Sequence, residues 1–131
     1  MKINTVCIID DDRIYQLTSI KILERINVAN NILVFSDGEK AYNFLSEMVS
    51  NENALPDVIF LDVNMPFMDA WQFLDAFTAL KPKLAKDITI YVISSSISEM
   101  DVERAKSIEA VKDYFVKPIT LDQYAKMLTS V

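Results

Sequence analysis

Histidine is absent from this chain of 131 residues. Its absence removes the usual general base, the Ser-His-Asp class of hydrolases and zinc sites with histidine ligands. The single cysteine, Cys7, lies inside an apolar run, so no intramolecular disulfide can form and we interpret it as a buried strand residue. Any chemistry must therefore use carboxylates, lysine and hydroxyl groups.

Basic charge is also scarce, because 13 Lys and Arg stand against 19 Asp and Glu, for a net charge of −6. Nucleic acid affinity depends on neutralising phosphates with basic side chains, so we expect no nucleic acid partner. No apolar run reaches the roughly 20 residues that span a bilayer, and the amino terminus lacks the features of a signal peptide. We expect a cytoplasmic protein without membrane insertion.

Length and composition indicate one domain over residues 1–131, since 51% hydrophobic residues suffice for a core. Short runs rich in β-branched and aromatic residues, without alternation, predict strands that are buried on both faces. These runs are residues 6–9, 32–35, 58–61, 88–93 and 114–116.

Helical spacing fills the segments between these strands. A helix follows Asp12 and ends near Asn27, and Asn30 with Asn31 marks a turn. The remaining helices are expected from a capping box at residues 36–39, over residues 70–80, after Ser98, and from a capping box at residues 120–123. Strand and helix thus alternate five times, which predicts a flavodoxin-like, doubly wound parallel sheet with strand order 2-1-3-4-5.

Charged or hydroxyl side chains follow four of the predicted strands at the point where each ends. In open parallel sheets ligands bind beyond the carboxyl ends of the strands, so these residues should converge there. They are Asp10, Asp11 and Asp12 after the first strand, Asp62 after the third, Ser94 after the fourth, and Lys117 before Pro118 after the fifth.

Such a cluster of carboxylates needs positive charge, since two like charges ~4 Å apart cost about 4 kcal/mol at an effective dielectric of ~20. Lys117 supplies one charge, and an all-oxygen site suits Mg²⁺. A carboxylate beside Mg²⁺, a lysine and a hydroxyl can accept a phosphoryl group. Asp62 is the expected nucleophile because it stands alone after the central strand, whereas Asp12 is expected to begin the following helix.

Four segments together resemble the receiver domains of two-component response regulators, in the family order and spacing. They are CIIDDD at residues 7–12, LDVNMPFMD at 61–69, ISS at 93–95 and YFVKP at 114–118. The resemblance covers essentially the whole chain and implies a single receiver domain with no output domain. It also implies a signalling protein that catalyses its own Mg²⁺-dependent phosphotransfer and autodephosphorylation.

The resemblance assigns roles to particular residues. Asp62 would accept the phosphoryl group and, with Asp11, bind Mg²⁺ directly. Asn64 would contribute its backbone carbonyl to the metal, and Asp10 would act through a metal-bound water. The remaining roles are phosphate contacts for Lys117 and Ser94, a conformational switch formed by Ser94 and Tyr114, and a cis peptide bond between Lys117 and Pro118 that would re-aim the ammonium.

The resemblance further implies two kinds of partner. The phosphoryl donor would be a phosphohistidine on a histidine kinase or on a histidine phosphotransfer protein. Output would pass to a downstream protein through the face made by the fourth helix, fifth strand and fifth helix, or onward along a phosphorelay. Two positions depart from the family pattern, since Ala70 and Ala110 stand where glycine is usual, which would matter if either backbone needs a positive φ.

Two other functions remain open. An Asp-x-Asp pattern at residues 10–12 is also typical of phosphatases of the haloacid dehalogenase type, although these usually need a longer core and a further acidic motif. The second alternative is an interaction module that keeps the fold without phosphorylation. For single residues, Ser94 could belong to a polar loop and Tyr114 could serve only in packing.

Overall fold

Five parallel strands form one sheet in the order β2-β1-β3-β4-β5, which confirms the predicted flavodoxin-like topology. The computed structural model describes residues 3–95 and 98–129. The strands are β1 (Ile3–Ile9), β2 (Ala29–Phe35), β3 (Val58–Asp62), β4 (Thr89–Ser94) and β5 (Val111–Val116).

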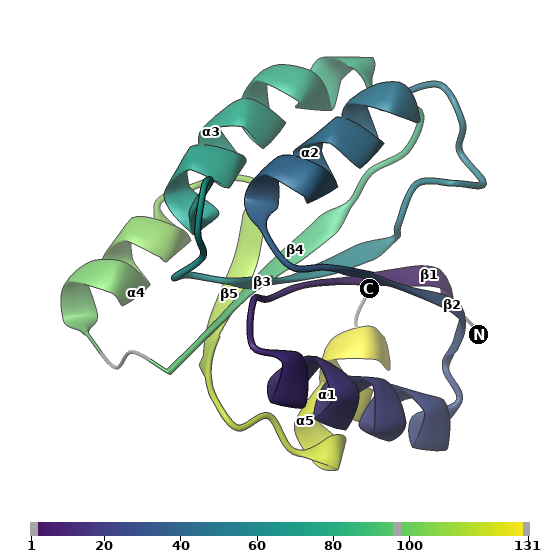
Figure 1. Ribbon diagram of the computed structural model, residues 1–131, viewed down its shortest axis with the longest axis vertical. Coiled ribbons are helices and arrows are strands. Elements are labelled where there is room, and N and C mark those ends of the chain that lie inside the picture. Colours follow the sequence, from purple (N-terminus) through teal and green to yellow (C-terminus); the bar gives the residue numbers. More distant parts are fainter. Residues whose placement is uncertain (1–2, 96–97, 130–131) are drawn as a thin grey trace.

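Helices cover both faces of this sheet (Figure 1). One face carries α1 (Arg13–Ile26) and α5 (Leu121–Thr129). The other carries α2 (Gly38–Glu47), α3 (Ala70–Leu80), which continues into the short 3-10 helix η1 (Lys81–Lys83), and α4 (Glu99–Lys106). Within the described ranges, no helix combines the length and the apolar character needed to cross a bilayer.

The alternating side chains of β1 show why its apolar run has no polar positions. Val6 and Ile8 pack in the cluster beneath α1 and α5, whereas Cys7 and Ile9 pack in the cluster beneath α2 and α3. All four residues are buried. Cys7 is a free cysteine in β1, so the prediction of a buried strand cysteine is confirmed, and burial raises the pKa of its thiol above the ordinary value.

An ion pair and its hydrogen bonds connect the amino ends of the central strands. The Asp57 carboxylate accepts hydrogen bonds from the backbone N–H groups of Asn4 and Thr5, each at 3.0 Å. Lys86 Nζ lies 3.0 Å from the same carboxylate and donates to the carbonyl of Leu55 at 3.0 Å. The segments that enter β1, β3 and β4 are thereby joined by groups whose charges balance.

The predicted turn at Asn30 and Asn31 is wrong, because both residues lie in β2. The turn comes earlier, at Asn27, which adopts a left-handed conformation with φ 55° and whose N–H bonds to the carbonyl of Leu23. Because β2 is an edge strand paired only with β1, its asparagine side chains can face solvent without a burial penalty.

The predicted cap of α2 is displaced by one residue. Asp37, rather than Ser36, is the N-cap, and its carboxylate accepts the N–H of Lys40 at 2.8 Å. A charged oxygen is the stronger acceptor near the positive end of a helix, so the carboxylate takes this position. The predicted capping box at Thr120 and Gln123 is confirmed by reciprocal hydrogen bonds of 2.9 and 3.1 Å.

Gly38, the first residue of α2, makes a close approach to the loop after β3. Its N–H bonds to the carbonyl of Met68 at 3.3 Å, and a Cβ at this position would lie 2.8 Å from that carbonyl oxygen and 3.2 Å from Cβ of Phe73. The contact with backbone cannot be relieved by a rotamer change, so only glycine fits here without moving the loop.

We therefore expect Gly38→Ala to destabilise the protein by about 1–3 kcal/mol, as overpacking usually does, although alanine is ordinarily the better helix former. Denaturant unfolding measures this difference. Glu39→Ala, at the exposed neighbouring position, is the control and should cost less than about 1 kcal/mol. An unchanged unfolding midpoint for Gly38→Ala would show that the loop moves without penalty.

Candidate functional site

The register of β1 against β3 brings two predicted site residues side by side. Ile9 is the partner of Leu61, so the next residues, Asp10 and Asp62, leave neighbouring strands at the same level. Both carboxylate residues are buried. The central strands β1 and β3 position the backbones of Asp10 and Asp62. Both carboxylates therefore lie at the carboxyl edge of the sheet.

The pairing of β4 with β5 brings the other two residues to the same edge. Ser94 is the partner of Val116, and the next residue, Lys117, donates its backbone N–H to the carbonyl of Ser94 at 2.8 Å. Ser94 is completely buried. The Lys117–Pro118 peptide bond is cis, as expected.

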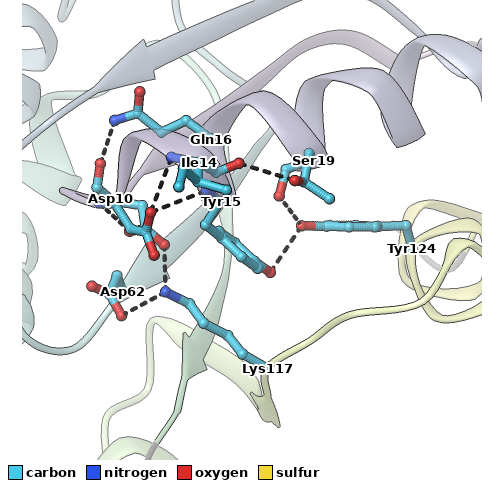
Figure 2. Close-up of polar contacts among 10 residues, drawn as sticks. Asp10, Ile14, Tyr15, Gln16, Ser19, Asp62, Lys117 and Tyr124 are labelled. Atoms are coloured by element: carbon cyan, nitrogen blue, oxygen red, sulfur yellow. Dashed lines mark hydrogen bonds and ion pairs between the residues drawn. The ribbon is translucent and has the colours of Figure 1, made fainter.

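The Lys117 ammonium lies between the two buried carboxylates (Figure 2). Its Nζ is 2.7 Å from Oδ2 of Asp10 and 3.4 Å from Oδ1 of Asp62. The lysine side chain is itself mostly buried, so these contacts are only weakly screened by solvent. One cation therefore faces two anions, and the site keeps a surplus of negative charge.

Asp11 adds a third carboxylate to this surplus. Asp10, Asp11 and Asp62 each offer an oxygen within 4.8 Å of the others, while Asp11 itself is exposed. This all-oxygen donor set with one solvent-facing member suits Mg²⁺, which keeps several of its waters. Asn64 lies two residues beyond Asp62 in an exposed loop, and its predicted carbonyl ligand stays a prediction.

The electrostatics of the site follow from burial and crowding. Burial, reinforced by the charge of Asp10, raises the pKa of Asp62 to about 6. Burial likewise raises the pKa of Asp10 above its ordinary value, against the hydrogen bond from Lys117. Burial alone would lower the pKa of Lys117, but the hydrogen bond to Asp10 and the charge of Asp62 outweigh it, so the pKa is raised. The ammonium thus stays charged at neutral pH.

Asp12, the third acidic residue of the run, has the structural role that the sequence predicts. It is the N-cap of α1, and its carboxylate accepts the N–H groups of Ile14 at 3.0 Å and Tyr15 at 3.2 Å. Its own N–H donates to Oδ1 of Asp10 at 2.9 Å. The start of α1 is therefore attached directly to the acidic site.

The two alanines at usual glycine positions need no special backbone conformation. Among the residues that the structure describes, a positive φ occurs at Asn27 and Phe67 and not at Ala70 or Ala110. Phe67, in the loop that follows Asp62, takes the left-handed conformation with φ 65° and is 84% exposed. The left-handed residue of this loop is thus Phe67, three residues before Ala70.

Tyr114, the second predicted switch residue, is buried in the core cluster shared with α3 and α4. Its ring thus already lies in the interior, one strand away from Ser94. Burial is compatible both with packing alone and with a change of position coupled to Ser94, so the predicted switch stays a prediction.

Sequence reasoning missed a polar group on α1 beside the site. The Gln16 side chain donates to the backbone carbonyl of Asp10, and the Tyr15 hydroxyl lies 3.2 Å from that of Tyr124, which is 2.8 Å from Oγ of Ser19 (Figure 2). Burial raises the pKa of both tyrosines, so both hydroxyls stay protonated. The available signal was the spacing of Tyr15 and Ser19, which lie one turn apart on α1 with Gln16 between them.

Comparison with known proteins identifies the family. A family model for the response regulator receiver domain matches residues 6–129. This chain belongs to the response regulator receiver domain family. The chain is also 32% identical to the chemotaxis protein CheY of Listeria monocytogenes, over 92% of each protein.

Solved structures share the receiver fold. A two-component response regulator from Cytophaga hutchinsonii superposes with a TM-score of 0.89 at 26% identity, covering 99% of this chain and 97% of that one. The receiver domain of a sensor histidine kinase from Pseudomonas aeruginosa superposes with a TM-score of 0.77 at 16% identity, covering 97% and 95%. That second protein has a magnesium ion coordinated in its active site cleft.

The raised pKa of Asp62 predicts that Asp62→Asn stabilises the metal-free receiver domain at neutral pH. The folded carboxyl titrates at about 6, whereas in the unfolded chain it titrates near 3.9. Between these values the folded state binds more protons, so stability falls as pH rises, and the penalty is complete by about pH 7.

Thermal or urea unfolding in the presence of a chelator measures this effect as a difference between the two proteins. We expect a gain on the order of 1–3 kcal/mol for Asp62→Asn above about pH 7 and no gain below about pH 4. A gain that persists at about pH 3 would contradict the assignment of the penalty to the ionised carboxylate.

The acidic cluster predicts a divalent cation site that depends on Asp11. Asp11→Asn should weaken Mg²⁺ binding by roughly tenfold or more, because it removes one formal charge from a site made of three carboxylates. Calorimetric titration measures the affinity. Asp12→Asn, which keeps an N-cap residue at the neighbouring position, should bind Mg²⁺ nearly as wild type does, and an equal loss in both variants would place the cation elsewhere.

Proposed function

We propose that the protein is a single receiver domain in which Asp62 accepts a phosphoryl group from a phosphohistidine on a histidine kinase or a histidine phosphotransfer protein. The observation that carries the proposal is the Lys117 ammonium between Asp10 and Asp62 at the carboxyl edge of the sheet, with Asp11 beside them. A cation aimed at a carboxylate in a partly buried, oxygen-rich site is the arrangement that phosphoryl transfer to aspartate needs.

In the transfer step an oxygen of the ionised Asp62 carboxylate attacks the phosphorus. The new bond joins this oxygen to phosphorus as the phosphorus–nitrogen bond of the phosphohistidine breaks, and the imidazole nitrogen leaves with the electron pair and takes up a proton. With a pKa of about 6, Asp62 is mostly ionised at neutral pH. It is therefore available as the nucleophile without a separate general base.

Lys117 and Ser94 would balance the charge on the transferring group. The ammonium of Lys117 lies 3.4 Å from Asp62 Oδ1, close enough to pair with a phosphoryl oxygen attached there. Ser94, adjacent to Lys117 through its backbone carbonyl, would donate its hydroxyl to another oxygen. Mg²⁺, held by Asp11 and Asp62 with the carbonyl of Asn64 and with Asp10 behind a water, would supply the remaining positive charge.

The phosphoryl group leaves when water attacks the aspartyl phosphate, which regenerates the carboxylate and releases inorganic phosphate. Each cycle consumes one donor phosphoryl group per protein, so the molecule acts as a signal carrier and not as an enzyme for external substrates. This behaviour separates it from a phosphatase of the haloacid dehalogenase type, which would turn over a phosphate monoester repeatedly.

The output would pass through the face formed by α4, β5 and α5. Apolar side chains on these elements face solvent, with Met100 80%, Val116 40% and Leu121 38% exposed. These apolar side chains could pack against a partner protein, but similar exposure at Ile14 and Phe67 shows that it is not confined to this face. Phosphorylation would bias this face through Ser94 and Tyr114, by shifting a pre-existing two-state equilibrium.

We expect acetyl phosphate to label the protein at Asp62 in a reaction that requires Mg²⁺ and stops on chelation. Asp62→Asn should abolish labelling because it removes the nucleophile, whereas the matched variant Asp12→Asn should label at the wild-type rate because Asn still caps α1. Intact mass spectrometry, which resolves one added phosphoryl group, measures the labelled fraction over time.

Equal labelling of Asp62→Asn would contradict the proposed acceptor. Multiple-turnover release of phosphate from a monoester would instead favour the phosphatase alternative. A wild-type protein that binds Mg²⁺ but takes no label from acetyl phosphate or from phosphorylated histidine proteins would favour an interaction module without phosphorylation.

A further inference from the structure

The ring of Tyr15 covers the side of the Lys117 ammonium that the carboxylates leave open. Nζ of Lys117 lies 4.2 Å from the centroid of this ring, well within the range of a cation–π contact. The same nitrogen lies 2.7 Å from Asp10 and 3.4 Å from Asp62. Two carboxylates and one aromatic face therefore define where the ammonium sits, and α1 supplies the aromatic face (Figure 2).

Tyr15 is itself held in place by a buried anchor on α5. Its hydroxyl lies 3.2 Å from the hydroxyl of Tyr124, and Oγ of Ser19 lies 2.8 Å from that same hydroxyl. Tyr124 is only 1% exposed, and its ring packs edge-on against Phe60 of β3 with centroids 5.1 Å apart. The ring over Lys117 is thus positioned by contacts to α5 and, through Tyr124, to the strand that carries Asp62.

We infer that Tyr15 is a positioning residue for Lys117, holding its ammonium where a phosphoryl group on Asp62 would meet it. The inference rests on the proposed phosphoryl transfer. A lysine side chain has a flexible four-carbon stem and several rotamers of similar energy, most of which point the ammonium away from the acceptor. A fixed aromatic face over the ammonium reduces the number of Lys117 rotamers that are populated.

The ring contact differs in one respect from the two ion pairs. When Asp62 takes the phosphoryl group, the oxygen facing Lys117 becomes part of an acyl phosphate and the negative charge moves to the phosphoryl oxygens. The uncharged face of Tyr15 is unchanged by this step. It can therefore keep the ammonium at the site before, during and after transfer, while the partner oxygens change.

The test compares three substitutions by the rate of labelling with acetyl phosphate at saturating Mg²⁺. Tyr15→Leu, which removes the ring, should label about fivefold more slowly, the effect expected for losing a partly buried cation–π contact. Tyr15→Phe keeps the ring and loses only the hydroxyl contact with Tyr124, so its loss of rate should be smaller than that of Tyr15→Leu. Tyr42→Leu is the matched control, because it removes a partly buried tyrosine from α2 on the opposite face of the sheet.

A double-mutant cycle separates positioning from packing. In a Lys117→Met background, Tyr15→Leu should have almost no further effect, because the residue it acts through is gone. The cycle is measured from labelling over long times and, in parallel, from the affinity for beryllofluoride with Mg²⁺. Mg²⁺ affinity alone should be the same in Tyr15→Leu and wild type, since Tyr15 is not among the carboxylate ligands.

Three results would overturn the inference: equal labelling rates of Tyr15→Leu and wild type, a loss in Tyr15→Phe as large as in Tyr15→Leu, or the same loss whether or not Lys117 is present. If Tyr15→Leu does not fold, Tyr15→Met, with a flexible side chain that fills similar space, takes its place. Failure of the proposed function has a different signature, because wild-type protein would then lack Asp62-dependent labelling.

Discussion

The contact of one ammonium with two buried carboxylates is the interaction on which the rest of the site depends. Asp10 and Asp62 occupy equivalent positions on adjacent parallel strands, and this register places them together whatever their mutual repulsion. Lys117, at the end of an edge strand, compensates part of that repulsion from 2.7 and 3.4 Å. The remaining negative charge favours the binding of a divalent cation. Burial, reinforced by the charge of Asp10, keeps the pKa of Asp62 high.

The two ends of the sheet differ in whether their carboxylates are balanced by positive charge. At the amino ends, the Asp57 carboxylate is satisfied by Lys86 and by two backbone N–H groups, so this end is closed and stable. At the carboxyl ends, Asp10 and Asp62 share Lys117, and Asp11 adds a third carboxylate beside them. Charge imbalance in a rigid framework lowers stability in the absence of a ligand, and a bound divalent cation would offset the surplus negative charge at this end.

The elements that were predictable share one physical property, namely that local sequence and tertiary environment favour the same structure. The central strands are continuous apolar runs, and the box at Thr120 is satisfied by its own neighbours. The failures occurred where two local signals competed. Asn30 and Asn31 have turn propensity but lie on an exposed edge strand, and at α2 two possible caps stood side by side, of which Asp37 prevailed over Ser36.

The sequence by itself determined the alternation of strands and helices and the kinds of side chain at the carboxyl edge, because hydrophobic periodicity and residue type are local properties of the chain. Only the tertiary structure decided the distances among those side chains, the raised pKa of Asp62 and the contact of Tyr15 with Lys117. These depend on burial and on the packing of α1 against α5, between residues separated by about a hundred positions in the chain. Composition and spacing carry no information on such separations, and the fold alone sets them.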